Sequence, residues 1–190
     1  MTPEREKRIR DVIKYRQNNL TLVLENIWDP HNVSAILRSA DSVGILDMYL
    51  IYNNSYFPKL GKKSSAGSKK WITMHPFTDV KTCYECLRSQ GYQIIATHLG
   101  EDTKSIYELD LTQKMALVFG NEHDGVSEDA YKLADGNFLI PQTGFTKSLN
   151  VSVAAAVSMY EVYRQRKDQL ECLSPLEQQE LFERWSSGPE

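Results

Sequence analysis

The sequence predicts an α/β fold with a mainly parallel, Rossmann-like sheet, and three observations lead to that prediction. Short apolar stretches of strand length alternate with helix-like segments almost throughout the chain. The segment 20–27 (LTLVLENI) is nearly all apolar, as expected for a strand that is buried on both faces. The chain has 190 residues, 41% of them hydrophobic and 25% charged, which are the proportions of a globular domain with its own core.

The expected elements follow one another with recognisable signals at their ends. In chain order we expect a helix at 3–16, a strand at 20–27, a helix at 30–43, strands at 45–52 and 71–76, a helix at 79–90, strands at 92–99 and 115–119, a helix at 127–134, a strand at 137–141, and helices at 150–170 and 174–186. Thr2-Pro3-Glu4 and Asp29-Pro30 each combine a capping residue with a first-turn proline. Ser174-Pro175-Leu176-Glu177 matches a capping box. The polar segments 53–70 and 100–113 are expected to be loops, the first with room for a helical turn.

Composition narrows the class of protein. The 22 basic and 25 acidic residues give a net charge of −3, and no apolar run approaches the roughly 18 residues that span a bilayer, so we expect no membrane segment. Three cysteines favour a reduced, cytoplasmic protein. Cys83 and Cys86 form a CxxC pair inside an expected helix, and we interpret them as packing thiols. The four histidines lack ligand spacing, so we expect no metal site.

The charge is unevenly distributed along the chain. Basic residues gather at 1–16, 59–70 and 164–167, whereas the tail after Cys172 is acidic. Each cluster taken alone is most simply a solvated surface. An acidic total can nevertheless hide a basic face, and polyanion binding responds to the local field. The sequence therefore leaves nucleic-acid binding open.

Three expected loops follow strands, at the edge of a parallel sheet where ligands bind. The loop after Ile27 leads into a helix that carries Asn32 and Arg38. Arg38 stands among apolar neighbours, which is an unusual place for a charge that only interacts with solvent. The alternative is a surface pair between Arg38 and Asp41, three residues further along the helix.

The other two loops are rich in glycine, hydroxyl and amide groups. The loop at 119–127 is a polar turn between Gly120 and Gly125, and Gly120 lets the backbone approach a ligand closely. It matches neither a P-loop nor a dinucleotide fingerprint. In the loop at 140–152, Ser148 or Asn150 can cap the following helix, but a cap accounts for only one of the two.

Together, three segments resemble the three motifs of SPOUT-class RNA ribose 2′-O-methyltransferases of the SpoU branch. These segments are DPHNVSAILRSADSVG, LVFGNEHDGVS and IPQTGFTKSLNVSVAAAVSMYE, and the similarity also includes SSAGSKKW and ATHL. The short N-terminal helix, the basic stretch after the long helix and the small tail most resemble the TrmH-type tRNA enzymes. The resemblance implies one methyltransferase domain at 1–172, a helical tail at 173–190, a deep trefoil knot in the C-terminal part of the sheet, and a homodimer.

The resemblance also implies an activity. It is the S-adenosylmethionine-dependent methylation of a ribose 2′-hydroxyl in tRNA, most similar to enzymes that act on guanosine 18 of the D-loop. Methylation of rRNA or of another tRNA position, and a non-catalytic RNA-binding module, are the alternatives. A chain of this length has no room for a separate N-terminal RNA-binding domain, which favours tRNA. A nicotinamide-dependent oxidoreductase is disfavoured because its glycine fingerprint is missing.

The resemblance also implies a role for each residue at a motif position. By resemblance Arg38 is catalytic, either deprotonating the 2′-hydroxyl or stabilising the alkoxide that forms, and Asn32 positions Arg38 or the ribose. Glu122, Ser148 and Asn150 are expected to order the site. Cofactor contacts are expected from Thr97, His98, Gly120, Ile140 and Leu149. Contacts to RNA phosphates are expected from Arg8, Arg10, Arg16, Lys62, Lys63, Arg164 and Arg166.

Overall fold

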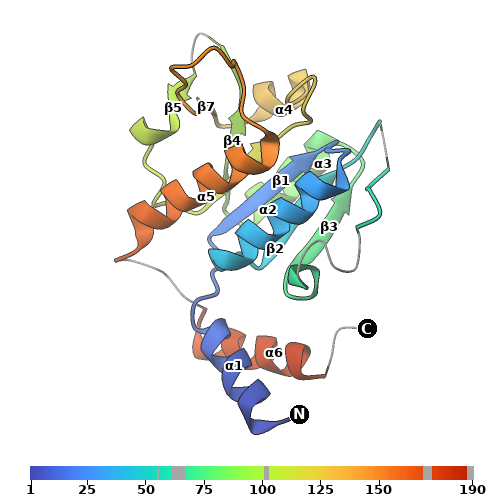
Figure 1. Cartoon of the computed structure of the whole chain (residues 1–190), viewed down its shortest axis with the longest axis vertical. Coiled ribbons are helices and arrows are strands. Elements are labelled where there is room, and N and C mark those ends of the chain that lie inside the picture. Colours follow the sequence, from blue (N-terminus) through green and yellow to red (C-terminus); the bar gives the residue numbers. More distant parts are fainter. Residues whose placement is uncertain (55, 61–66, 101–102, 169–172, 188–190) are drawn as a thin grey trace.

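The computed structural model has the α/β fold that the sequence predicts (Figure 1). It describes residues 1–54, 56–60, 67–100, 103–168 and 173–187. The strands are β1 (Leu20–Glu25), β2 (Asp47–Ile51), β3 (Thr73–Phe77), β4 (Gln93–Thr97), β5 (Lys104–Ser105), β6 (Met115–Phe119) and β7 (Gly136–Leu139). They form a 7-stranded sheet in the order β3-β2-β1-β6-β4-β7-β5. Every pairing in the sheet is parallel.

Four of the helices cover the two faces of this sheet, and the first and last lie at its amino end. The helices are α1 (Pro3–Ile13), α2 (Pro30–Ser42), α3 (Val80–Ser89), α4 (Glu128–Leu133), α5 (Val151–Arg166) and α6 (Pro175–Ser186), with short 3-10 turns η1 (Ser68–Lys70) and η2 (Ile106–Glu108). Leu22, Leu24 and Leu117 point to the face that α2 and α5 cover. Val23 and Val118 point to the face that α3 and α4 cover. This alternation explains why the central strands are apolar at nearly every position.

A third apolar cluster joins the two ends of the chain. Ile9 and Ile13 of α1 pack with Leu181 and Trp185 of α6, and Trp71 meets Trp185 edge to face at 5.0 Å between ring centroids. Figure 1 shows α1 and α6 side by side, below the sheet and away from the carboxyl ends of its strands. The first and last helices therefore stabilise each other at the amino end of the sheet.

The sheet register brings the three polar loops to one edge. Leu24 of β1 lies opposite Phe119 of β6, and Thr97 of β4 lies opposite Phe138 of β7. Because neighbouring parallel strands end together, the loops that follow β1, β6 and β7 begin at the same edge. No helix among the described residues is long and apolar enough to cross a membrane.

The two segments expected to be loops contain more structure than the sequence indicates. Residues 53–70 include η1, which is the helical turn that the sequence allows for. Residues 100–113 include β5 and η2. Strand β5 has two residues, Lys104 and Ser105, and pairs at the edge with β7, so it has too few side chains to produce a strand pattern.

Candidate functional site

Side chains from the three loops meet in one hydrogen-bonded group. The amide nitrogen of Asn32 donates to Oε1 of Glu122, and Nδ2 of Asn150 donates to Oδ1 of Asn32 at 3.0 Å. Asn32 lies 118 positions from Asn150 in the sequence and is only 8% exposed. The structure thus brings together Asn32, Glu122 and Asn150, one residue from each motif.

Local capping fixes these three residues on their elements. Asp29 caps α2 by accepting from the backbone N–H of His31 at 2.8 Å, which places Asn32 in the first turn. Asn150 caps α5 by accepting from the N–H of Ser152 at 2.9 Å. In the loop after β6, Asn121 accepts from the backbone N–H groups of residues 123 and 124, both at 2.9 Å. That turn, which lies between β6 and α4, holds Glu122 in place.

Gly120 is required by close packing within the same loop. A Cβ at this position would lie 1.9 Å from the carbonyl oxygen of Gly125 and 2.2 Å from the backbone nitrogen of Val126. Gly125 itself has a φ of 70°, in the left-handed region that favours glycine. The two glycines therefore let the turn fold back on itself directly after β6.

Arg38 lies on the exposed face of α2. Within the part of the chain that the structure describes, it makes no hydrogen bond or ion pair. The alternative that Arg38 pairs with Asp41 is wrong, because Asp41 instead accepts a hydrogen bond from the buried guanidinium of Arg16. The guanidinium of Arg38 is therefore exposed and unpaired among the described residues.

A cavity of about 720 Å³ opens at the carboxyl ends of β4, β6 and β7. Its volume is in the range of small-molecule sites. The five residues expected to contact the cofactor all line it: Thr97, His98, Gly120, Ile140 and Leu149. Glu122, Ser148 and Asn150 line it as well. The cavity therefore joins the predicted cofactor residues to the hydrogen-bonded group.

The cavity walls combine apolar surface with negative charge. Phe138, Leu139 and Val151 line it with apolar side chains, and Glu122 adds a carboxylate. His98 stacks on Tyr131 with 3.9 Å between ring centroids, which stiffens one wall. The described residues contain no group of metal-ligating side chains.

Two aromatic residues beside the site are absent from the sequence-based set. The Tyr52 hydroxyl donates to the carbonyl of Ile27 at 2.7 Å, and burial, reinforced by the charge of Glu122, raises the pKa of Tyr52 far above its usual range. The exposed ring of Trp28 lies 5.7 Å from His123. Tyr52 directly follows β2, and Trp28 lies in the loop after β1, so a position after a strand is the signal that marks both.

The basic residues expected to contact RNA divide into three groups. Arg8, Arg10 and Arg164 are exposed; Arg10 pairs with Glu6 at 3.0 Å and Arg164 with Glu161 at 2.7 Å. Lys62 and Lys63 lie outside the described residues.

The remaining two, Arg16 and Arg166, are each 2% exposed, so the expectation that they contact phosphates is wrong for this structure. Arg16 donates to the carbonyl of Ile45 at 3.1 Å and pairs with Asp41. Arg166 donates to the carbonyl of Leu111 at 2.7 Å. Both guanidinium groups satisfy buried backbone carbonyls and so are withheld from solvent.

The CxxC pair lies on α3, against the sheet. Cys83 is buried, and this burial raises the pKa of its thiol to about 12. Cys86 is partly buried, and both cysteines are free. A thiol with so high a pKa stays protonated at neutral pH and is a poor nucleophile and metal ligand.

Comparisons with known proteins agree with this geometry. The model of the SpoU rRNA Methylase family matches residues 19–160. The chain is 43% identical over 165 residues to the tRNA (guanosine(18)-2′-O)-methyltransferase of Thermus thermophilus, covering 87% of this chain and 84% of the relative. It is 37% identical over 168 residues to the Escherichia coli K12 protein of the same name, covering 88% and 73%.

Solved structures show the same fold. The crystal structure of the A. aeolicus TrmH/SpoU tRNA modifying enzyme superposes with a TM-score of 0.90 at 33% identity, covering 98% of both chains. The SpoU methyltransferase AviRb from Streptomyces viridochromogenes, in complex with AdoMet, superposes with a TM-score of 0.71 at 27% identity, covering 83% of this chain and 64% of that one. With its three motifs joined through the hydrogen bonds of Asn32 to Glu122 and Asn150, the chain belongs to the SpoU rRNA Methylase family.

Proposed function

We propose that this protein is an S-adenosylmethionine-dependent tRNA ribose 2′-O-methyltransferase that acts on guanosine 18. The observation that carries the proposal is the contact between Asn32, Glu122 and Asn150 at the edge of a ligand-sized cavity. The relatives named tRNA (guanosine(18)-2′-O)-methyltransferase support the substrate, since this chain covers 84% of the first and 73% of the second.

Some residues of the chain orient the reacting groups, and others stabilise the charge that develops during the reaction. When bound, S-adenosylmethionine supplies an activated methyl group to an attacking oxygen. A guanidinium is a hydrogen-bond donor that proteins keep protonated, so Arg38 acts by stabilising negative charge as it develops on the 2′-oxygen, and the hydroxyl proton is released to water. Asn32 is held by Glu122 and Asn150, and it therefore fixes the geometry of the first turn of α2. Holding the reacting groups in line accounts for much of the rate.

Replacing Arg38 tests the proposed function. In Arg38→Ala we expect kcat on tRNA to fall by about 10²- to 10³-fold, as for the loss of one preorganised donor, while S-adenosylmethionine affinity stays within twofold. Arg38→Lys should retain part of the activity because it retains the charge. The substrate is tRNA from a strain that lacks the modification, with the methylated nucleotide mapped by mass spectrometry. Absence of transfer by the wild-type protein, with RNA binding intact, would favour a non-catalytic RNA-binding module.

We also propose that the protein is a homodimer through α5. Large hydrophobic side chains on the outward face of this helix are exposed: Val153 at 46%, Tyr160 at 52% and Tyr163 at 40%. Neighbouring Leu149 in the cavity wall is 37% exposed. A contiguous apolar surface of this kind is typical of a protein–protein interface. A second copy that covered it would also close the cavity on one side.

Light scattering tests the dimer. We expect twice the chain mass for the wild-type protein and for Leu176→Asp, whose side chain on α6 is 70% exposed. Val153→Asp introduces a charge at the centre of the proposed interface, and the variant should be monomeric and bind S-adenosylmethionine more weakly. A wild-type monomer would contradict the proposal, as would a dimer that Val153→Asp leaves intact.

We also propose a knotted sheet, a division into a methyltransferase domain and a tail, and a cellular location. We propose a trefoil knot in the C-terminal part of the sheet because the chain belongs to the family in which the sequence resemblance implies one. The methyltransferase domain at 1–172 contains the family match at 19–160, and the tail at 173–190 carries α6. A cytoplasmic location is supported by the free thiols of Cys83 and Cys86.

A further inference from the structure

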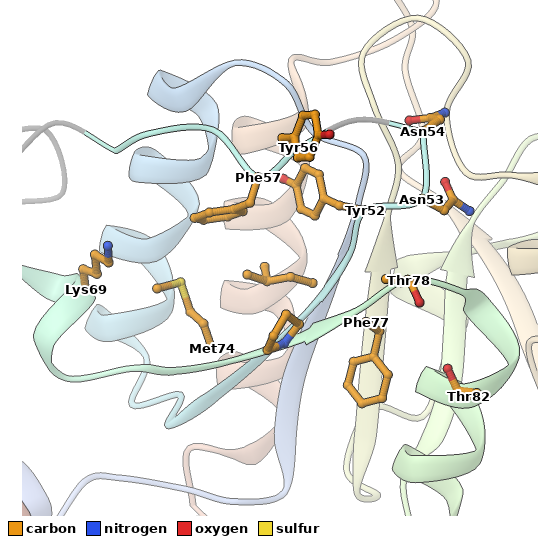
Figure 2. Close-up of a pocket in the computed structure, with 12 residues that line it drawn as sticks. Tyr52, Asn53, Asn54, Tyr56, Phe57, Lys69, Met74, Phe77, Thr78 and Thr82 are labelled. Carbon is orange, nitrogen blue, oxygen red and sulfur yellow. The ribbon is translucent and has the colours of Figure 1, made fainter.

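We propose that a second cavity, at the carboxyl ends of β2 and β3, binds the base of a substrate-RNA nucleotide neighbouring the methylated one. The proposal rests on the proposed function, since it assumes an RNA substrate. The cavity has a volume of about 990 Å³ and lies apart from the three motif loops, with no lining residue in common with the cofactor cavity (Figure 2). It is therefore a separate site in the part of the chain that the structure describes.

The lining includes four aromatic residues. Tyr52, Tyr56, Phe57 and Phe77 all contribute, and Tyr52 meets Phe57 edge to face at 5.4 Å and 89°. Figure 2 shows Tyr56 at the mouth, above the rings of Tyr52 and Phe57. Tyr56 is 97% exposed, so its ring contributes little to the core. Exposed rings beside an apolar hollow are the usual platform on which an unstacked base is bound.

The polar groups of the cavity suit an anionic ligand. None of its described lining residues is acidic, and Lys69 supplies an ammonium group. Asn54 and Thr78 are exposed at the lining and offer hydrogen bonds to the edge of a base. The hydroxyl of Thr82, by contrast, is occupied by Asp79 at 2.7 Å. A ligand with an aromatic ring and a phosphate therefore meets complementary groups here.

Two direct contacts link the lining of this cavity to the first motif loop. Tyr52, which follows β2, donates to the carbonyl of Ile27 at the start of the first motif loop. Asn53 exchanges hydrogen bonds with Asn26, at 2.8 Å between side chains and 3.2 Å from the Asn53 N–H. An RNA strand that follows the first motif loop would thus pass this cavity with a neighbouring nucleotide.

Tyr56 provides the first test. In Tyr56→Ala we expect KM for unmodified tRNA to rise about tenfold, the effect of losing one stacked base, with kcat and S-adenosylmethionine affinity unchanged. Tyr56→Phe keeps the ring and should behave as wild type. Tyr107→Ala is the matched control, because Tyr107 is 55% exposed and lies in η2, beside β5 at the opposite edge of the sheet from β3.

Lys69 provides a second, independent readout. The logarithm of tRNA affinity falls linearly with the logarithm of salt concentration, and loss of one phosphate contact reduces that slope by about 0.7–0.9. We expect this reduction in Lys69→Ala and no change in Lys104→Ala, in β5 at the far edge of the sheet.

The outcomes separate this inference from the proposed function. Wild-type constants in Tyr56→Ala together with an unchanged salt slope in Lys69→Ala, in a protein that methylates tRNA, would overturn the base site alone. A wild-type protein that neither binds nor methylates tRNA would overturn both. Ultraviolet cross-linking of bound tRNA should place a nucleotide on the peptide that contains Tyr56 and Phe57, and cross-links confined to other peptides would count against the proposal.

Discussion

At the scale of single residues, the oxygen and the nitrogen of the Asn150 side chain make two different hydrogen bonds. Oδ1 of Asn150 accepts from the backbone N–H of Ser152 and so caps α5, while Nδ2 donates to Asn32. The sequence presents capping and site formation as alternatives for this residue. The structure shows both, because an asparagine side chain carries an acceptor and a donor on opposite sides of one carbon.

The two functions of Asn150 can be separated by substitution. Asn150→Asp keeps the capping acceptor and loses the donor to Asn32, so we expect thermal stability near that of wild type and a fall of at least tenfold in kcat. Asn150→Ala loses both and should in addition lose about 1 kcal/mol of stability, the usual value of a helix N-cap. Thermal unfolding and methyl transfer are measured on both variants. Equal activity in Asn150→Asp and wild type would show that the contact with Asn32 is dispensable.

The motif residues of the site could be identified from sequence because each motif has a fixed local pattern. The role of an arginine within a basic cluster could not. Arg16 and Arg166 belong to basic clusters in the sequence, yet both are buried against backbone carbonyls. Whether a cationic side chain faces solvent or an unpaired carbonyl depends on segments far away in the chain. For Arg166 that segment is 55 positions distant, at Leu111.

At the scale of elements, apolar runs predict where strands lie but not how they are ordered. The strands β1, β2, β4 and β6 all fall within the apolar segments that the sequence indicates. Their spatial order, with β6 between β1 and β4, follows from the path of the connections, which no local pattern records. The pairing of α1 with α6 is likewise a contact between the two ends of the chain.

The contact between α1 and α6 predicts how the stability of the protein changes when the Trp185 side chain is removed. Trp185 is 4% exposed and packs on Trp71, with the guanidinium of Arg16 5.2 Å from its ring centroid. In Trp185→Ala we expect a loss of about 3–5 kcal/mol in stability, as for other buried aromatics. Hydrogen exchange should rise in both α1 and α6, because each helix depends on the other.

The cofactor cavity lies at the other end of the sheet, so S-adenosylmethionine affinity should stay unchanged in Trp185→Ala. Leu176→Ala is the matched control on α6, since its side chain is 70% exposed. Faster exchange confined to α6, with α1 still protected, would mean that α1 is stable without its neighbour.

At the scale of the whole molecule, the core buries groups that release protons only at high pH. Tyr84 is fully buried and donates to the carbonyl of Ala130 at 2.9 Å. Burial raises the pKa of Tyr84 and Tyr92 well above the usual range of tyrosine, and it raises the pKa of Cys83 from 9.0 to about 12. These groups lie between the sheet and the helices α3 and α4, so their ionisation is coupled to unfolding.

The sign of the resulting pH dependence follows from proton binding. Above pH 9 the unfolded chain releases the Cys83 proton while the folded chain retains it. The contribution of Cys83 to the free energy of unfolding is therefore fully present below pH 9 and is lost as the pH rises toward 12. Each such group contributes a slope of at most about 1.4 kcal/mol per pH unit.

Urea unfolding at pH 8, 9, 10 and 11 measures the decline in the free energy of unfolding. Cys83→Ala should delay its onset toward pH 10, where the tyrosines begin to ionise in the unfolded chain. Cys86→Ala is the matched variant, because it removes a partly buried thiol from the same helix. Identical profiles for Cys83→Ala and wild type between pH 9 and 10 would mean that the Cys83 thiol ionises equally in both states.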